Sequence, residues 1–390
     1  MEMGWLVKGL LILLKILFSI LEVLIIKKIK GSQPISLVKN NLLLYKSNKF
    51  YLYNDKLDSY EYLFQFNTDL KTKLIGKSRL LTRLFRKDIK SYVKINNEEF
   101  FLSFNKKIFY VSLKKKTVTK VFDIPVGFSE PLNYCIPLQG NPTFKIFFGD
   151  YGNNSERECV SVYGIDKELT VKKVYTFKKG DIRHIHNIIP DKYKYGYYIF
   201  TGDNEEKAGI YWSNSDFSVV KPVFIGDQRG RAVAGFVTSS GLLYAMDSIS
   251  EKNYIWLLTE KDGETSLKKI GDLNGSVIYS TKYLSGYLLS TTVESPERTN
   301  NSKLSLFSVK RGKGILSNEV QLVYVDEKFD VVIFKQFKKD KLPYKLFQYG
   351  AVKFPSGLES SETLVVYPTA VRKDDGDTLM LDGKKLLLNE

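Results

Sequence analysis

The chain has 390 residues, enough for one large domain or two ordinary ones. Its 25 tyrosines and 25 phenylalanines favour many short strands over helical packing. The net charge is +16, but the basic residues are mostly scattered lysines without a dense basic block, which argues against nucleic acid as a partner. An anionic lipid or an acidic glycan fits the charge better.

The first element is an apolar stretch at residues 5–26, WLVKGLLILLKILFSILEVLII, in which sixteen residues are Leu, Ile, Val or Phe. As a helix it is long enough to cross the hydrocarbon core of a bilayer. Its polar residues fall on one stripe: Lys8, Lys15, Ser19 and Glu22. The helix therefore either spans the membrane with this stripe against a partner helix, forming oligomers through the anchor, or lies in the interface.

Three lysines, Lys27, Lys28 and Lys30, follow this segment. By the positive-inside rule they place the main domain on the cytoplasmic side of the membrane. The sequence thus predicts a membrane-anchor helix within residues 1–30 and a main domain over residues 36–390.

The main domain contains a repeat of about 45 residues. Gly196, Gly241 and Gly286 each open a similar apolar segment and are 45 residues apart, and Asp227 and Asp272 keep the same spacing. Each unit has the pattern of four short strands, which is the size of a β-propeller blade. The length predicts seven four-stranded blades, with six or eight as the alternatives and a pair of β-sandwiches as the competing all-β fold.

One unit illustrates the pattern, with strands expected at 184–190, 196–202, 209–214 and 219–225. Residues 69–88 break the repeat and are expected to form a short helix or a long loop. A propeller usually closes by pairing strands from its two ends. The candidates for closure are residues 377–390 and residues 41–55.

Two arginines occupy the same point of adjacent units, Arg183 in RHIHNI and Arg231 in RAVAGF. If both face the central channel, they offer paired forks for a carboxylate, sulfate or phosphate. The alternative is that both donate hydrogen bonds to carbonyl groups between blades.

Both histidines of the chain, His184 and His186, lie on one predicted strand and project to the same side. They could move protons during catalysis, with Asp150 or Asp203 as carboxylate partner, or be buried side chains bonded to the backbone. Shared metal ligation would need further ligands from other blades. We therefore predict no metal and no cofactor.

Two tyrosines, Tyr349 and Tyr151, are candidates for stacking on sugar rings. Cys135 and Cys159 have no metal-site spacing and are expected to be two buried free thiols, with one disulfide as the alternative.

The run RHIHNIIPDKYKYGYYIFTGDNEEKAGIYWSNSDF resembles the sialidase-like β-propellers with BNR, or Asp-box, repeats. The resemblance covers roughly residues 150–250 and implies a carbohydrate-active or carbohydrate-binding propeller. Only Asp216 keeps the Asp-box pattern, and the Arg-Ile-Pro signature of sialidases is missing because Asp123 precedes Ile124 and Pro125.

Two functions follow from these observations. The first is a membrane-tethered enzyme of the hydrolase or lyase type acting on an acidic glycan or polysaccharide, with Arg183 and Arg231 holding the sugar acid. The second is a non-catalytic propeller that binds a glycan or forms a scaffold in surface-polysaccharide assembly. Whether the chain is an enzyme is left open by the sequence.

Overall fold

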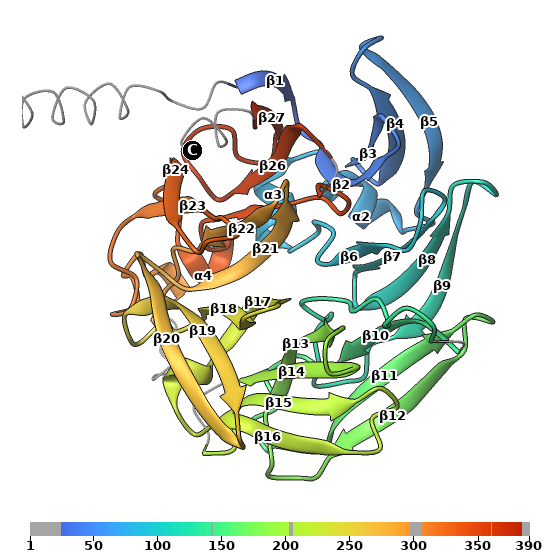
Figure 1. Cartoon of the computed structure of the whole chain (residues 1–390). Helices are drawn as coiled ribbons and strands as arrows, with labels where there is room; N and C mark the ends of the chain where they lie inside the picture. Colours follow the sequence, from blue (N-terminus) through green and yellow to red (C-terminus); the bar gives the residue numbers. More distant parts are fainter. Residues whose placement is uncertain (1–24, 142, 203–205, 297–305, 360, 384–390) are drawn as a thin grey trace, which may run out of the picture.

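The computed structural model describes residues 25–141, 143–202, 206–296, 306–359 and 361–383. Their strands form seven small antiparallel sheets arranged as a ring, which Figure 1 shows along its axis. Six sheets have four strands and one has three. The prediction of an all-β fold with seven blades is confirmed.

The blades follow the chain, with the first strand of each innermost. Blade 1 has β2 (Gln33–Val38), β3 (Asn41–Lys46), β4 (Lys49–Asn54) and β5 (Ser59–Gln65). Blade 2 has β6 (Tyr92–Lys94), β7 (Glu99–Phe104), β8 (Lys107–Ser112) and β9 (Thr117–Asp123). Blade 3 has β10 (Phe144–Gly149), β11 (Val160–Asp166) and β12 (Val171–Phe177). Its innermost position is taken by an isolated bridge between Cys135 and Phe147.

The second half of the ring is more regular. Blade 4 has β13 (His184–Asp191), β14 (Gly196–Gly202), β15 (Gly209–Asn214) and β16 (Val220–Ile225). Blade 5 has β17 (Ala232–Thr238), β18 (Gly241–Met246), β19 (Asn253–Lys261) and β20 (Glu264–Leu273), preceded by the short 3-10 helix η1 (Gln228–Gly230). Blade 6 has β21 (Val277–Tyr283), β22 (Gly286–Thr291), β23 (Glu319–Val325) and β24 (Val331–Lys338).

The repeated glycines have a common steric cause. Gly196, Gly241 and Gly286 each begin the second strand of a blade. A Cβ atom at any of them would collide with a carbonyl oxygen of the third strand, that of Ser213, Leu258 or Val325. Only glycine permits this close approach, so its 45-residue spacing marks the same point of successive blades.

The apolar core is divided among the gaps between blades. One cluster joins blades 1 and 2 through side chains such as Phe50 and Phe104, and another joins blades 3 and 4 through Phe147 and Tyr197. A single four-stranded sheet buries too little apolar surface by itself, so each blade is stabilised by its two neighbours.

The ring closes in blade 7, which has β25 (Ala351–Lys353), β26 (Thr363–Thr369), β27 (Thr378–Asp382) and, outermost, β1 (Ile25–Ile29). Strand β1 pairs antiparallel with β27, placing Ile29 opposite Thr378. The closure from the carboxyl end is as predicted, whereas the partner predicted at residues 41–55 is wrong. That segment forms β3 and β4 of blade 1, because β1 already supplies the closing edge.

The predicted anchor helix lies almost wholly outside the described residues. Its last two residues, Ile25 and Ile26, belong to strand β1, so the propeller begins at residue 25 instead of 36. Of the three lysines used for orientation, Lys27 forms ion pairs with Asp55 and Asp58, and Lys28 with two carboxylates of blade 7. No helix among the described residues is long and apolar enough to span a membrane.

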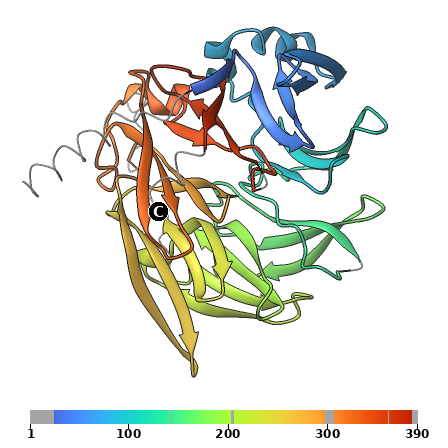
Figure 2. The same cartoon turned by 45° about the horizontal axis from the view of Figure 1, so that its top comes forward.

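Residues 69–88 form two short helices, α2 (Leu70–Ile75) and α3 (Arg79–Leu84), as the break in the repeat predicted. Asp69 caps α2 by accepting a hydrogen bond from the Thr72 amide at 2.9 Å, and the Ser78 hydroxyl accepts one from Leu81 at the start of α3. The third helix, α4 (Tyr344–Phe347), connects blades 6 and 7 and packs against α3. Figure 2 shows α2 and α3 standing out from the ring.

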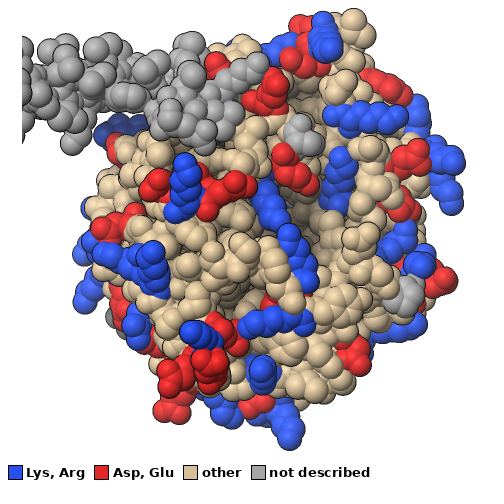
Figure 3. All heavy atoms as spheres, viewed as in Figure 1, with Lys and Arg blue, Asp and Glu red and all other residues tan. Residues whose placement is uncertain are grey.

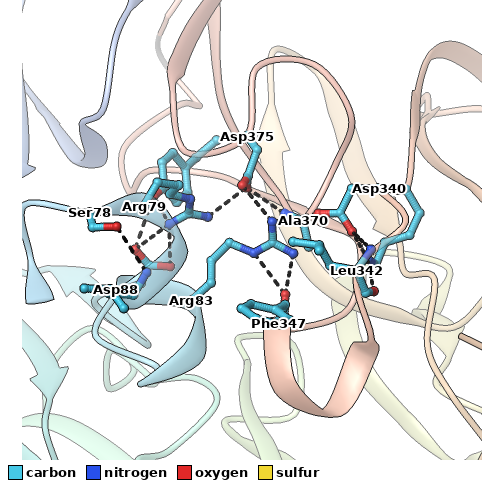
Figure 4. Close-up of polar contacts among 12 residues, drawn as sticks. Ser78, Arg79, Arg83, Asp88, Asp340, Leu342, Phe347, Ala370 and Asp375 are labelled. Atoms are coloured by element: carbon cyan, nitrogen blue, oxygen red, sulfur yellow. Dashed lines mark hydrogen bonds and ion pairs between the residues drawn. The ribbon is translucent and has the colours of Figure 1, made fainter. Parts of the chain in front are cut away.

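A network of ion pairs fastens α3 to the ring (Figure 4). Arg79 contacts Asp88 at 2.9 Å and Asp375 at 2.9 Å. Arg83 contacts Asp375 at 3.0 Å and Asp340 at 2.6 Å. Because Asp340 follows blade 6 and Asp375 lies in blade 7, this network, which we call the α3 network, connects the start of the chain to its end.

Candidate functional site in the central channel

The channel at the centre of the ring is lined by the innermost strands and the residues at their ends. Strand β13 contacts β17, β17 contacts β21, and β21 contacts β25, which places these four strands side by side around the axis. The predicted site residues His184 and His186 lie on β13, and Arg231 precedes β17.

The two histidines lie in direct contact. Their Nε2 atoms are 2.9 Å apart, and both side chains are buried. In a regular strand residues i and i+2 are about 7 Å apart. Here the pairing of β13 with β14 shifts between Ile185 and Asn187, so His186 is the extra residue of a β-bulge. The bulge turns its ring toward His184.

The other ring nitrogens establish where the protons lie. His184 Nδ1 is 2.7 Å from the carbonyl oxygen of Gly152, and His186 Nδ1 is 2.9 Å from that of Ala232. A carbonyl oxygen only accepts, so both Nδ1 atoms carry hydrogen. Two bare Nε2 lone pairs at 2.9 Å would repel each other. The arrangement therefore favours uptake of a proton or a cation between the two Nε2 atoms.

Gly202 makes room for the histidine pair. It lies on β14 opposite His184, and a Cβ atom there would collide with the His186 ring and lie 2.8 Å from His184 Nε2. The corresponding residues of blades 5 and 6 are Met246 and Thr291. A glycine at position 202 is thus required by the two imidazoles packed against it.

Both predicted tyrosines lie in the channel region. The Tyr151 ring packs against His184, with ring centroids 4.8 Å apart, and lies 6.1 Å from the His186 ring. The Tyr349 hydroxyl is 3.4 Å from that of Tyr279 on β21. Burial raises the pKa of Tyr349 well above its usual value, and the charges of Tyr279, Glu294 and Tyr151 add to the effect.

The two predicted arginines differ in exposure. Arg231 is buried, and its Nε is 4.0 Å from an oxygen of Asp247, at the end of the neighbouring strand β18. Arg183 is half-buried and directly precedes β13. Because Ala232 accepts the hydrogen bond of His186, Arg231 and the histidine pair are neighbours across the junction of blades 4 and 5.

Of the two predicted carboxylates, only Asp150 is described, and Asp203 lies outside the described residues. An oxygen of Asp150 accepts hydrogen bonds from the Ser161 amide at 2.9 Å and the Tyr163 hydroxyl at 3.3 Å, both in blade 3. Burial raises the pKa of Asp150 to about 6. The contact with the histidine strand is made by the Asp150 backbone, whose carbonyl oxygen accepts a hydrogen bond from the Ile185 amide at 2.8 Å.

A cluster of cations that the sequence did not single out lines the opposite side of the channel. Lys90, before β6, and Lys353, on β25, line a cavity of about 120 Å³ with Tyr279 and Asn133. Arg86 shares a smaller adjoining cavity, of about 80 Å³, with the same two lysines and Tyr349. We call Arg86, Lys90 and Lys353 the channel cations. Figure 3 shows basic side chains beside the central hollow of the face seen in Figure 1.

The channel cations act on one another. Burial in the concave wall lowers the pKa of Lys90, although its side chain still reaches solvent, and the positive charges of Lys353, Arg86 and Lys106 lower it further while Glu130 opposes them. Burial likewise lowers the pKa of Arg86. In the described part of the chain no carboxylate lies within ion-pair distance of the three. An anion in the cavity would relieve their mutual repulsion.

The channel cations and the histidine pair belong to one channel. Asn133 lines the cavity of Lys90 and Lys353, and its side-chain amide donates to the carbonyl oxygen of His186 at 3.5 Å. Tyr349 gives a second connection, because burial raises its pKa and the charge of Tyr151 raises it further. The Tyr151 ring in turn packs on His184. A bound anion would therefore lie within the same channel as the imidazoles.

The histidine pair has the spacing of two ligands of one metal ion. Nitrogen ligands about 2.1 Å from one ion lie roughly 3 Å apart, close to the Nε2 separation of 2.9 Å. Nδ1 atoms that donate to carbonyl oxygens are typical of metal-bound histidines. No group of three or more His, Cys, Asp or Glu residues able to hold a metal occurs in the described ranges. Those ranges thus supply two ligands.

The cysteine prediction is half correct. Both thiols are free, and Cys135 is buried beside Phe147, but Cys159 is exposed. Cys159 precedes β11 at the end of a surface loop, where strand alternation gives no indication of burial.

Comparison with known proteins gives a fold and no family. No family model matches the chain, so the resemblance to sialidase-like repeats is not confirmed, and no curated protein matches it in sequence. Among solved structures, oligogalacturonate lyase in complex with manganese is similar with a TM-score of 0.54 and 9% identity, over 89% of this chain and 87% of that chain.

A second oligogalacturonate lyase, from Vibrio parahaemolyticus, has a TM-score of 0.53 and 10% identity, over 91% of this chain and 90% of that one. A prolyl endopeptidase has a TM-score of 0.52 and 10% identity, and the match covers 94% of this chain but 52% of that chain. At such low identities these likenesses establish the β-propeller fold alone.

Proposed function

We propose that the propeller binds an acidic oligosaccharide in its central channel and cleaves it by a lyase-type elimination. The observation that carries the proposal is the presence, in one channel, of a pair of imidazoles with converging Nε2 atoms and of three cations that have no described carboxylate within ion-pair distance. Supporting it is the likeness in fold to two oligogalacturonate lyases, which are named for an acidic sugar polymer.

The cations would hold the sugar acid. A carboxylate between Lys90 and Lys353, with Arg86 in the adjoining cavity, receives charge-assisted hydrogen bonds, and Arg183 and Arg231 would bind a second acid group near the histidines. Neutralising the carboxylate is also a chemical requirement. It stabilises the negative charge that develops when the proton on the adjacent carbon is removed.

The histidine pair would move the proton. An imidazole Nε2 takes the proton from the carbon next to the carboxylate, and the electron pair of that C–H bond forms a carbon–carbon double bond. The bond from the neighbouring carbon to the glycosidic oxygen breaks, and this oxygen leaves with its electrons. The proton is then shared between the two Nε2 atoms until it passes to the leaving oxygen or to water, which balances the reaction.

A divalent cation is the second way to use the same two nitrogens. The manganese belongs to the neighbour and not to this chain, but His184 and His186 are the residues that would hold such an ion. Bound there, it would polarise the sugar carboxylate as a Lewis acid. In that case Arg183 and Arg231 would still position the substrate.

Incubation with galacturonate oligomers tests the proposal. Elimination gives an unsaturated uronate that absorbs in the ultraviolet and products whose masses sum to that of the substrate, whereas hydrolysis adds one water. We expect the unsaturated product, and we expect His186→Ala to abolish it. Repeating the assay with a chelator and then with added manganese separates the shared-proton arrangement from the cation arrangement.

The alternative is a propeller that binds a glycan, or forms a scaffold in polysaccharide assembly, without cleaving it. Binding of the oligomer with no product after prolonged incubation would replace the lyase by this function. Absence of both binding and product across uronate oligomers would remove the acidic-glycan assignment. Products carrying an added water would support a hydrolase, closer to the sialidase-like resemblance.

We further propose, from the sequence, that residues 5–24 tether the propeller to a membrane with the propeller on the cytoplasmic side. Lys27 and Lys28 form ion pairs with carboxylates of the propeller. Lys30 forms none with the residues that the structure describes, so its charge is the one that supports this orientation. Protease protection in intact and inverted membrane vesicles tests the orientation. Recovery of the full chain in the soluble fraction would contradict the tether.

A further inference from the structure

Helices α2 and α3 expose most of the large apolar side chains of their sequence, whereas Thr72, Thr82 and Arg83 are buried. Their largest apolar residues face solvent, with exposed fractions of 72% at Leu70, 54% at Leu74, 50% at Leu80, 38% at Leu81 and 45% at Phe85. The residues facing the protein are Thr72 and Ile75 on α2, and Thr82 and Arg83 on α3. In a soluble domain the apolar stripe of a helix normally faces the core.

The α3 network prevents the helices from rotating about their axes to bury these apolar side chains. Arg83 is held by Asp375 at 3.0 Å and by the Phe347 carbonyl at 2.9 Å, and Arg79 by Asp88 at 2.9 Å. Rotating the helices so that their apolar face packs inward would break the ion pairs of Arg79 and Arg83, which is costly because it leaves carboxylates without their cations. The exposed face is therefore built into the fold.

The exposed side chains form one surface. Leu70 and Leu74 are one turn apart on α2, and Leu81 and Phe85 are one turn apart on α3. Lys71 Nζ lies 5.8 Å from the centre of the Phe85 ring, which brings the two helices together at this point. Figures 1 and 2 place both helices on one face of the ring, outside the blades.

The charge of this surface identifies what it fits. Residues 70–87 contain seven basic residues and no acidic one. Lys71, Lys73 and Lys77 are exposed around the leucines. A second copy of the chain would bring the same lysines face to face, which disfavours self-association. Leucine and phenylalanine framed by lysines is the pattern of helices that lie in the interface of an anionic membrane.

We propose that the α2–α3 surface (Leu70, Leu74, Leu80, Leu81 and Phe85, with Lys71, Lys73 and Lys77) docks on an anionic lipid bilayer. The apolar side chains enter the region of the lipid headgroups, and the lysines contact phosphate groups. This contact does not depend on residues 5–24 or on the function of the channel. It holds the ring at the membrane in one orientation.

Vesicle sedimentation tests the proposal with residues 25–390, which contain every described strand of the seven blades. Circular dichroism and thermal melting first establish that each variant folds. The parent is expected to bind phosphatidylglycerol-containing vesicles at least tenfold more tightly than phosphatidylcholine vesicles. Leu74→Ser with Phe85→Ser should reduce binding at least tenfold, and Lys71→Gln with Lys73→Gln and Lys77→Gln should abolish the preference for anionic lipid.

A matched control uses exposed apolar residues elsewhere on the ring. Leu57 and Val126 are 74% and 103% exposed, and replacing both by serine should leave vesicle binding unchanged. Equal loss in this control would show nonspecific adsorption and overturn the proposal. So would unchanged binding of the Leu74/Phe85 variant, or a parent that forms dimers which this variant abolishes, because the surface would then join two copies.

Discussion

Arg83 and Arg86 lie three residues apart at the end of α3 and differ in how their charges are balanced. Arg83 is buried between Asp340 and Asp375, and its half-buried neighbour Arg79 lies between Asp88 and Asp375. Arg86 instead lines the channel with Lys90 and Lys353, where no described carboxylate comes within ion-pair distance. One short segment thus supplies a region with balanced charges and a region with excess positive charge.

The pKa directions report the same difference for carboxylates. Burial alone would raise the pKa of Asp88, but Arg79 and Lys353 hold it below its usual value. At Asp150 burial prevails and raises the pKa to about 6, because its hydrogen bonds from Ser161 and Tyr163 and the charge of Lys173 offset it only in part. Balanced charges stabilise the ring, and unbalanced ones remain available for a ligand or a proton.

The largest expected effect is in the α3 network. Arg83→Met leaves Asp340 and Asp375 buried without this cation, and we expect the free energy of unfolding to fall by about 3–5 kcal/mol. Urea denaturation measures it. The control is Lys116→Gln, whose ion pair with Glu61 is exposed on both sides and should be worth less than about 1 kcal/mol. A small effect at Arg83 would mean that the network does not brace the closure.

The next effect is a dependence of stability on pH at Asp150. Its folded-state pKa is raised above the unfolded value, so its contribution is fully present below pH about 4 and is lost as the pH rises through about 6. The loss is at most roughly 3 kcal/mol for a carboxyl group whose pKa is about 6 in the folded state. Asp150→Asn should remove this pH dependence of stability, because the amide does not ionise.

The pH experiment compares denaturation midpoints of parent and variant between pH 4 and 7. Their difference should grow with pH in favour of Asp150→Asn, while Asp262→Asn, in the exposed turn between β19 and β20, should follow the parent. Parallel profiles for parent and Asp150→Asn would place the carboxylate in a wetter environment than its burial indicates.

A smaller effect separates binding from stability in the channel. Lys90→Met should weaken binding of a galacturonate oligomer roughly 10- to 100-fold, because one hydrogen bond to a charged group is worth about 1.5–3 kcal/mol. Its unfolding free energy should stay the same or rise, since a repulsive charge is removed. Calorimetric titration measures binding, with Lys207→Met, which lines neither of the two cavities, as the control. Lower stability with unchanged binding would assign Lys90 to the fold.

The smallest effect concerns the thiols. Burial raises the pKa of the Cys135 thiol, so one equivalent of a thiol reagent should react with the native protein, at Cys159, and a second only after unfolding. Two fast equivalents would show that blade 3 opens readily, in contrast to the closure held by the α3 network.

The blades themselves could be predicted because their causes are local. Strands 184–190 and 196–202 were expected from alternation and turn residues and are found at His184–Asp191 and Gly196–Gly202. The 45-residue glycine spacing also follows from a local contact between the second and third strands. That both histidines share a strand is likewise visible in the sequence.

The rest was decided by the tertiary structure, since it depends on contacts between distant residues. Lys90 and Lys353 are separated by most of the chain and share a cavity because blades 2 and 7 are brought to one axis by closure of the ring. The run FRKDIK at residues 85–90 indicates basic character, but nothing in the sequence around Lys353 indicates that it faces the channel. The contact of His184 with His186 depends on a bulge and on the missing side chain of Gly202, neither of which alternation alone can predict.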